Sequence, residues 1–386
     1  MTDISLPFEE TKTSVHSEEA LLLQRFRALA KDQCALSGVS LYGQLVIGLS
    51  LYLYPFVSTP GYLSILLTLP FLLFLSLSAR RLLKNTPPGE NLLLFTGGKG
   101  LGKIFAFFFS LIFFLDSLLA AYALTAMMQR VLPDMSALLI SLSVTAVMAI
   151  TIAGSDLYAL HRLARFLRWI FLFLFFFCAL TTLSSGSMGH FFPLLGAGEE
   201  SIFRGALWLM GCMGGACCPF IMPLSRESHG PLLEKKRLLL WPLLSALAAG
   251  MLSAMLSAFL MPFYALSRPE SLGWRLLLIP HISPSLAVWS LFLCGQMFLM
   301  LVTLAAGVTR SSAMLCLSIG NDRHKPLLIT LLLFLQVPFC ALNLESIESF
   351  LRMIAPFRGV LAGGMICLML LLSGIRKRRE RREMAP

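Results

Sequence analysis

Charged residues are scarce in this chain. Asp, Glu, Lys and Arg make up 13% of its 386 residues, whereas 57% of the residues are hydrophobic. A soluble domain could not bury that much apolar surface, because its exterior has to be covered largely by polar side chains. The composition therefore argues against a water-soluble globular fold and predicts an all-α polytopic membrane protein.

The sequence also lacks the patterns on which catalysis or metal binding depends. We find no nucleophile with a nearby base, no metal-ligand cluster and no paired carboxylates, so neither an enzyme nor a cofactor or metal site is expected. The nine cysteines match no zinc spacing, and we expect them to be small buried hydrophobic residues. The stretch GGKGLGK (Gly97 to Lys103) begins like a phosphate-binding loop, but Ile104 stands where Ser or Thr is needed, so a tight turn is expected.

Neither a cleavable secretion signal nor a nucleic-acid-binding module is expected. The first apolar segment follows an acidic, polar stretch and is expected to direct membrane insertion itself. The formal net charge is +11, but the basic residues flank apolar segments, so nucleic acid is not an expected partner. The basic tail, Arg376 to Arg382, is expected to lie against anionic lipid headgroups.

Long apolar windows are what the chain has in abundance. Ten windows of about 20 residues are each long enough to cross roughly 30 Å of hydrocarbon as a helix. They lie at 36–57, 61–79, 103–128, 135–154, 167–184, 202–222, 238–262, 285–309, 326–343 and 353–374. We therefore predict ten transmembrane helices.

The basic residues between these windows predict the orientation. Most of the 31 Lys and Arg fall on one side, which the positive-inside rule makes cytoplasmic. The exceptions, assigned to the outer side, are Arg130, Arg204, Arg268, Arg275, Arg352 and Arg358. Both termini are then cytoplasmic, and Glu345 and Glu348 are expected to be solvated charges on the outer side.

The ten windows divide evenly at an external connection. We expect a cytoplasmic segment 1–35, a first repeat 36–184, the connection 185–201, a second repeat 202–374 and a basic cytoplasmic tail 375–386. Because five is odd, the second half enters the membrane from the opposite face. This is a 5+5 inverted repeat, in which substrate sites form near mid-membrane at discontinuous helices.

The first helix of each half carries a predicted break. GCMGGACCPF (Gly211 to Phe220) interrupts helix six, and Gly48, Ser50 and Pro55 interrupt helix one. Glycine and proline weaken a helix, and the open backbone groups are tolerable in lipid only beside a cavity or a ligand. The alternative is that the glycines simply allow close helix packing.

Polar residues in other windows complete the candidate site. Asp116 is the one acidic residue deep in a window; it is expected to face the bundle interior and either bind a ligand or ion or have a structural role. Tyr52, Tyr54, Tyr122 and Gln296 are pocket candidates that are equally compatible with ordinary helix contacts. The predicted ligand-binding residues are Gly48, Ser50, Tyr54, Asp116, Gly211, Gly214, Gly215 and Gln296.

Four stretches resemble the spore germination permease family, the B subunits of nutrient germinant receptors within the amino acid, polyamine and organocation transporter superfamily. They are IGLSLYLYP (47–55), PGYLSILL (60–67), PPGENLLLFTGGKGLGKIFAFFFSL (87–111) and HFFPLLGAGEESIFRGAL (190–207). Ser50 replaces a usual second glycine, and Cys217-Cys218-Pro219 lies in a stretch that commonly differs among relatives; both departures concern the predicted ligand site.

The resemblance implies a receptor subunit in the inner membrane of a spore. It would sense a small nutrient such as an amino acid and act with a membrane A subunit and a lipoprotein C subunit. The broken helices would offer a helix N-terminus to the ligand carboxylate and open carbonyls to its ammonium. Two alternatives remain: a secondary transporter in which Asp116 couples transport to a proton or cation, and a scaffold whose pocket has degenerated.

Overall fold

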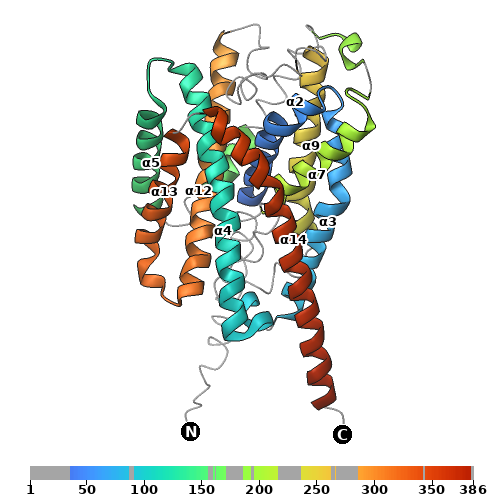
Figure 1. The fold of residues 1–386 in the computed structure, drawn as a ribbon, viewed down its shortest axis with the longest axis vertical. Helices are drawn as coiled ribbons and strands as arrows, with labels where there is room; N and C mark the ends of the chain where they lie inside the picture. The colour runs from blue at the N-terminus through green and yellow to red at the C-terminus, as the bar shows by residue number, and fades with distance from the viewer. Residues whose placement is uncertain are drawn as a thin grey trace, which may run out of the picture.

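The computed structural model describes residues 35–86, 91–154, 160, 162–170, 186–192, 195–215, 236–261, 266, 286–341 and 344–383. Within these ranges the regular elements are helices, most of which run along one common axis (Figure 1). Six described helices are long and apolar enough to cross a membrane, and two shorter apolar helices cover Ala137–Ile152 and Lys325–Ala341. This is the all-helical, membrane-spanning architecture that the composition predicts.

The described elements occur in the following chain order. Helix one, Ala35–Phe56, contains the π-helix η1 (Leu49–Leu53) and the segment α2 (Tyr54–Phe56). The later elements are α3 (Gly61–Asn85), α4 (Leu92–Val131), α5 (Ala137–Gly154), η2 (Met188–Phe191), α7 (Glu199–Gly214), α9 (Lys236–Leu260), α12 (Leu286–Ile319), η4 (Asp322–His324), α13 (Lys325–Ala341) and α14 (Leu344–Glu383).

Each predicted window overlaps a described helix, although only residues up to 170 of the window 167–184 are described. Three helices, α4, α12 and α14, are longer than their predicted windows and continue into polar residues at their ends. The inverted arrangement of two five-helix halves and the domain boundaries stay predictions.

Helix one is interrupted in a different way from the one predicted. Gly48 has right-handed helical angles, and the chain then passes through the π-helix η1 instead of unwinding. The cause is Pro55, which has no amide to donate to Leu51, so the hydrogen bonds shift register: Tyr54 N–H bonds to Leu49 O and Ser58 N–H to Leu53 O. Backbone groups at this point are therefore largely paired within the helix.

The centre of the bundle is the contact between α4 and α12. The two helices approach closely because small residues face each other. Ser110 and Ser311 exchange hydrogen bonds, with each Oγ donating to the other's carbonyl at 2.9 Å. A Cβ on Gly307 would come within 2.7 Å of Ser117 Cβ. Small and hydroxyl-bearing residues are the usual means of joining helices in a membrane, where the hydrophobic effect does not drive helix association.

One end of the bundle gathers basic residues. Arg376 at the end of α14 donates to Phe95 O near the start of α4 at 2.5 Å, and a Cβ on Gly320, just after α12, would lie 3.5 Å from Lys103 Nζ. We call this the basic end, defined by Arg81, Lys84, Lys99, Lys103, Arg323 and Lys377. Arg130 lies at the opposite end of α4, as the charge count predicts.

The glycine-rich stretch at the start of α4 forms the expected tight turn. Gly98 has φ 65° and ψ −173°, which bends the chain between the first turns of α4 and its main length. A Cβ on Gly102 would lie 2.7 Å from Leu93 O, so the two parts of the turn meet at backbone distance. Glycine alone fits both the positive φ and the close approach.

Candidate functional site

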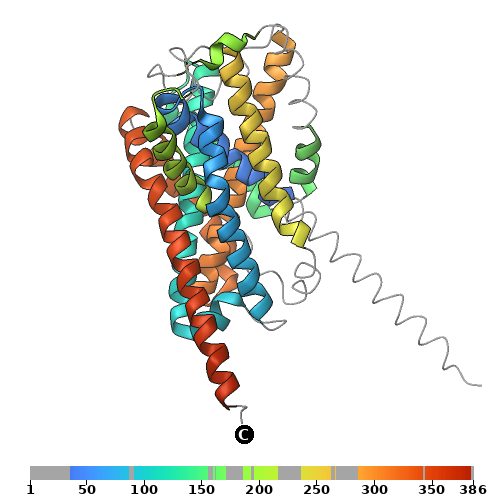
Figure 2. The same ribbon diagram turned by 90° about the vertical axis from the view of Figure 1, so that its right-hand side faces the viewer.

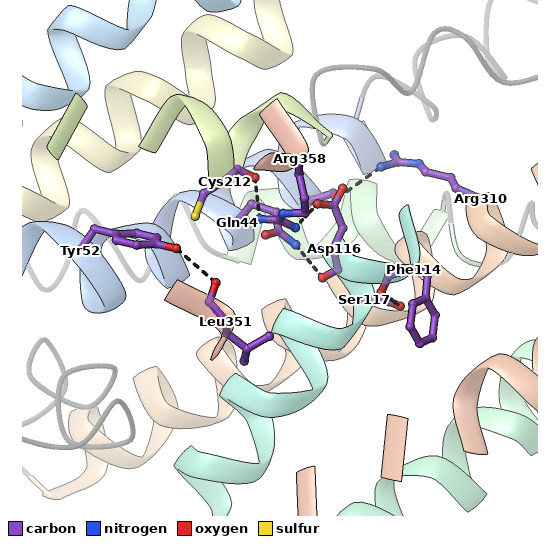
Figure 3. A network of polar contacts seen from close by, with 10 residues as sticks. Gln44, Tyr52, Phe114, Asp116, Ser117, Cys212, Arg310, Leu351 and Arg358 are labelled. Atoms are coloured by element: carbon purple, nitrogen blue, oxygen red, sulfur yellow. Dashed lines mark hydrogen bonds and ion pairs between the residues drawn. The ribbon is translucent and has the colours of Figure 1, made fainter. Parts of the chain in front are cut away.

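Asp116 is buried in the middle of α4 and forms an ion pair with Arg358 of α14 (Figure 3). Asp116 is 4% exposed and Arg358 is 1% exposed. Charges at this depth are costly unless they are paired and hydrogen-bonded, and they normally face the bundle interior. Asp116 thus lies where the sequence predicts. The charge count assigned Arg358 to the outer side, and that assignment is wrong. Arg358 lies inside the bundle.

Arg358 also binds the end of α7. Its Nη2 donates to Cys212 O at 3.1 Å, in the last turn of that helix. The last carbonyls of a helix lack partners within the helix, so a buried guanidinium there satisfies one of them. Gly215 follows directly, and a Cβ on it would lie 2.6 Å from Asp116 Oδ2. The absence of a side chain at Gly215 therefore lets the end of α7 approach the ion pair.

A second guanidinium faces the same carboxylate. Arg310 of α12 is 4% exposed, and Figure 3 shows its side chain pointing toward Asp116. The positive charge of Arg310 interacts electrostatically with the Asp116 carboxylate. Arg310 Nη1 also donates a long hydrogen bond to Ser40 Oγ of helix one at 3.4 Å. We name Gln44, Asp116, Arg310 and Arg358 the charged cluster. It carries one carboxylate and two guanidinium groups.

Gln44 of helix one completes the charged cluster. Its Nε2 donates to Asp116 O at 2.8 Å, and its side chain is fully buried. Its Oε1 has no hydrogen-bond partner among the described residues. A buried polar atom without a partner costs about 1–3 kcal/mol, so it marks a place where a further donor would bind favourably.

The charged cluster joins helix one, α4, α7, α12 and α14 at one point, and its chemistry suits a zwitterion. Guanidinium groups recognise carboxylates with paired N–H donors, whereas a carboxylate and a free amide oxygen accept from an ammonium. Among the described residues, no group of three or more His, Cys, Asp or Glu is arranged to hold a metal ion.

The predicted glycines of helix six lie beside the charged cluster but pack against a helix. A Cβ on Gly214 would lie 2.6 Å from Gly359 Cα, and one on Gly211 would overlap the backbone of Pro356. Gly48 packs on the other side of α7, where a Cβ would lie 2.6 Å from Leu209 Cδ1. These three positions show the close packing that the sequence left as the alternative. The rest of the predicted break, 216–220, lies outside the described residues.

The other predicted residues lie in separate places. Tyr54 OH pairs with Ser257 Oγ of α9 at 2.8 Å. Ser50 is buried in η1. Gln296 is buried on α12, and its Oε1 has no hydrogen-bond partner among the described residues. It lies fourteen residues before Arg310, or roughly 21 Å along the helix axis.

Tyr52 and Tyr122, the further pocket candidates, are also buried. Tyr52 OH donates to Arg352 O at 2.9 Å, which ties helix one to α14. Tyr122 is 1% exposed in α4. The hydroxyl groups of Tyr52 and Tyr54 thus bond one helix to another, which is the ordinary role that the sequence left open for them.

Three members of the charged cluster are absent from the residues that the sequence singled out. Arg358 lies within the window 353–374, so the rule applied to Asp116 covers it as well. Arg310 directly follows the window 285–309 and was counted among the basic residues between windows. Gln44 gave no comparable signal. Glu348 is a further correction: it is 8% exposed and pairs with Arg352, because both lie one turn apart on α14.

A model of the family described as spore germination protein matches residues 44–277 of this chain. The match contains all four stretches on which the sequence resemblance rests. It begins at Gln44 and includes Asp116 and Gly215, whereas Arg310 and Arg358 follow it in the chain. A search of the curated proteins gives no match.

Proposed function

This chain belongs to the spore germination protein family, and from that premise we propose that it is the membrane subunit of a germinant receptor that senses an amino acid. Its membership and its apolar helices make it a germination-related integral membrane protein. The observation that supports the finer proposal is the charged cluster, whose charges are complementary to those of a zwitterionic amino acid.

In the proposed mode of binding, the ligand replaces internal contacts. Its ammonium donates to Gln44 Oε1, which has no hydrogen-bond partner among the described residues, and to the Asp116 carboxylate. Its carboxylate accepts from Arg358, which otherwise pairs with Asp116. The gain comes from the amide oxygen, which is buried without a partner before the ligand arrives.

Binding at this place is linked to movement of helices. Gln44, Asp116 and Arg358 are all under 5% exposed, so a ligand reaches them only when the helices that carry them separate. The guanidinium of Arg358 connects α14 to both α4 and α7. A ligand that takes over either contact favours a different packing of the three helices, and this change is the proposed signal.

The rest of the proposal concerns partners and place. The subunit acts with a germinant-receptor A subunit and a C lipoprotein subunit in the inner membrane of the spore. The basic end faces the cytoplasm together with both termini, in line with the positive-inside rule. We propose no catalytic activity. A proton- or cation-coupled transporter of the same fold is the second candidate, because Asp116 is a buried carboxylate that such coupling requires.

The test is nutrient-triggered release of dipicolinic acid from spores that lack this gene and carry restored variants. Gln44→Met removes the free amide oxygen at nearly constant volume. Gln336→Met is the matched control, because Gln336 is also buried and also bonds to α4: its Nε2 donates to Ser117 Oγ at 2.6 Å. We expect Gln44→Met to raise the nutrient concentration for half-maximal release about 10- to 150-fold. This factor corresponds to the free energy of one hydrogen bond to a charged group.

Gln336→Met is expected to keep the wild-type concentration at equal membrane levels. Equal responses of the two variants would overturn the binding site, and unchanged release after deletion for every nutrient would overturn the receptor function. Uptake of labelled amino acid that Asp116→Asn abolishes, without any germination defect, would favour the transporter.

A further inference from the structure

A cleft lies between α3 and α14 near the basic end, away from the charged cluster. Its volume is about 480 Å³. The two helices run side by side there in both views (Figure 2), and Asn85 Nδ2 donates to Ser373 Oγ between them at 3.4 Å. The lining residues are Arg81, Asn85, Cys367, Leu370, Leu371, Ser373, Gly374 and Lys377.

The lining changes in character along α14. Cys367, Leu370 and Leu371 give an apolar wall toward the middle of the helix, and Lys377 gives a cation near its end. From Cys367 to Lys377 the helix rises roughly 15 Å. Arg81 on α3 provides the second cation. The cleft is thus apolar toward the middle of α14 and positively charged toward the basic end.

The surroundings keep this positive charge available. None of the lining residues is acidic. Arg376, the neighbour of Lys377, is engaged elsewhere: its guanidinium lies 4.1 Å from the centre of the Phe95 ring and donates to Phe95 O. Lys377 and Arg81 therefore face the cleft from opposite helices, with Asn85 and Ser373 as neutral polar groups beside them.

We propose that this cleft binds an anionic phospholipid, with the phosphate group between Arg81 and Lys377 and an acyl chain along Leu370 and Leu371. Basic pockets between membrane helices on the side with excess Lys and Arg suit such headgroups. A free phosphate would use the cations but leave the apolar wall uncovered. A zwitterionic lipid would bring its own cation next to Arg81 and Lys377.

Cys367 offers a direct readout, since it is an exposed free thiol in the lining, and Cys294 on α12 is an exposed free thiol outside it. The full chain, purified in detergent, is treated with N-ethylmaleimide while phosphatidylglycerol or phosphatidylcholine of equal acyl chains is added. Alkylation at the two cysteines is followed by peptide mass spectrometry. We expect phosphatidylglycerol to slow the reaction of Cys367 at concentrations where phosphatidylcholine does not, with Cys294 unaffected.

Two sets of variants test the geometry. Each cation near an anionic lipid contributes a factor of about five to the binding constant. In the double variant Arg81→Gln and Lys377→Gln, half-maximal protection of Cys367 should therefore need an about 30-fold higher phosphatidylglycerol concentration. Gly374→Leu fills the cleft, because a Cβ there meets nothing within 4 Å. It should remove the dependence on phosphatidylglycerol. Gly364→Leu is the matched control on the same helix, since a Cβ there also meets nothing within 4 Å.

Several results would overturn the proposal. Equal protection by both lipids would leave an apolar groove without headgroup preference, and protection by glycerol 3-phosphate alone would identify a site for a free phosphoester. An unchanged phosphatidylglycerol curve in the double glutamine variant would show that the two cations take no part.

Discussion

At the scale of single residues, the Asp116–Arg358 pair is better understood through its specificity than through its net strength. Removing two charges from water costs several kcal/mol for each ion, and their attraction roughly repays that cost. The pair therefore adds little stability in total. It does fix which residue of α14 faces α4, since a shift of α14 separates the buried Arg358 guanidinium from the Asp116 carboxylate.

The cost of breaking the pair is the first prediction. Asp116→Asn leaves the Arg358 guanidinium buried at 1% exposure without its counterion, and we expect a loss of about 3–5 kcal/mol in the free energy of unfolding. Glu200→Gln is the control, because it breaks the exposed pair with Arg204 and should cost at most about 1 kcal/mol. Denaturant unfolding in detergent measures both, and equal losses would contradict the buried pairing.

At this scale the sequence predicted one of the four residues of the charged cluster, Asp116. A carboxylate in an apolar window has to face inward, so Asp116 was identifiable from its position alone. Its pairing with Arg358 was not identifiable, because Arg358 lies far along the chain and the pairing depends on how α14 packs against α4. Gln44 was hidden for another reason: an uncharged amide in an apolar helix has many ordinary roles.

At the scale of helices, the crossing of α7 and α14 depends on glycine. A Cβ on Gly359 would lie 2.6 Å from Gly211 Cα and 2.7 Å from Met210 O. Backbones that meet this closely gain dispersion contacts and exclude lipid, which is how small residues join membrane helices. The crossing also places Arg358, the residue before Gly359, at the end of α7.

The second prediction compares two glycines of α14. Gly359→Ala should lower the melting temperature, because a methyl group there meets the backbone of α7, and overpacking costs about 1–3 kcal/mol. Gly364→Ala should raise the melting temperature, because alanine favours the helix and the position is open. The expected gain in the free energy of unfolding is up to about 1 kcal/mol. Thermal unfolding in detergent gives the signs, and a stabilised Gly359→Ala protein would rule out the close crossing.

The break in helix one illustrates the limits of prediction for elements. Glycine, serine and proline showed that the backbone of helix one departs from a regular helix, and it does so at η1. The sequence did not show that the departure would be a π-helix, because that outcome depends on whether shifted hydrogen bonds can replace the one that Pro55 removes.

At the scale of the whole molecule, the charge pattern explains which ends lie together. The end of α3, the start of α4, the end of α12 and the end of α14 meet at the basic end through contacts of Asn85, Lys103 and Arg376. These groups of basic residues were assigned to one side from the sequence alone. Arg358 was counted on the outer side although it lies within the window 353–374, because the count assumes that every cation lies outside the membrane, and this one pairs with Asp116 inside the bundle.

The third prediction tests how the bundle spans the membrane. Asp134 follows α4 and His324 precedes α13, and both are exposed. From Lys103 near the basic end to Val131, α4 rises roughly 42 Å, more than the hydrocarbon thickness, so the two positions lie on opposite sides. In a version with alanine at the native cysteines, Asp134→Cys should react with a membrane-impermeant maleimide in intact protoplasts. His324→Cys should react only after permeabilisation. The reverse pattern would place the basic end outside, and labelling of both positions in intact cells would mean that α4 does not cross the membrane.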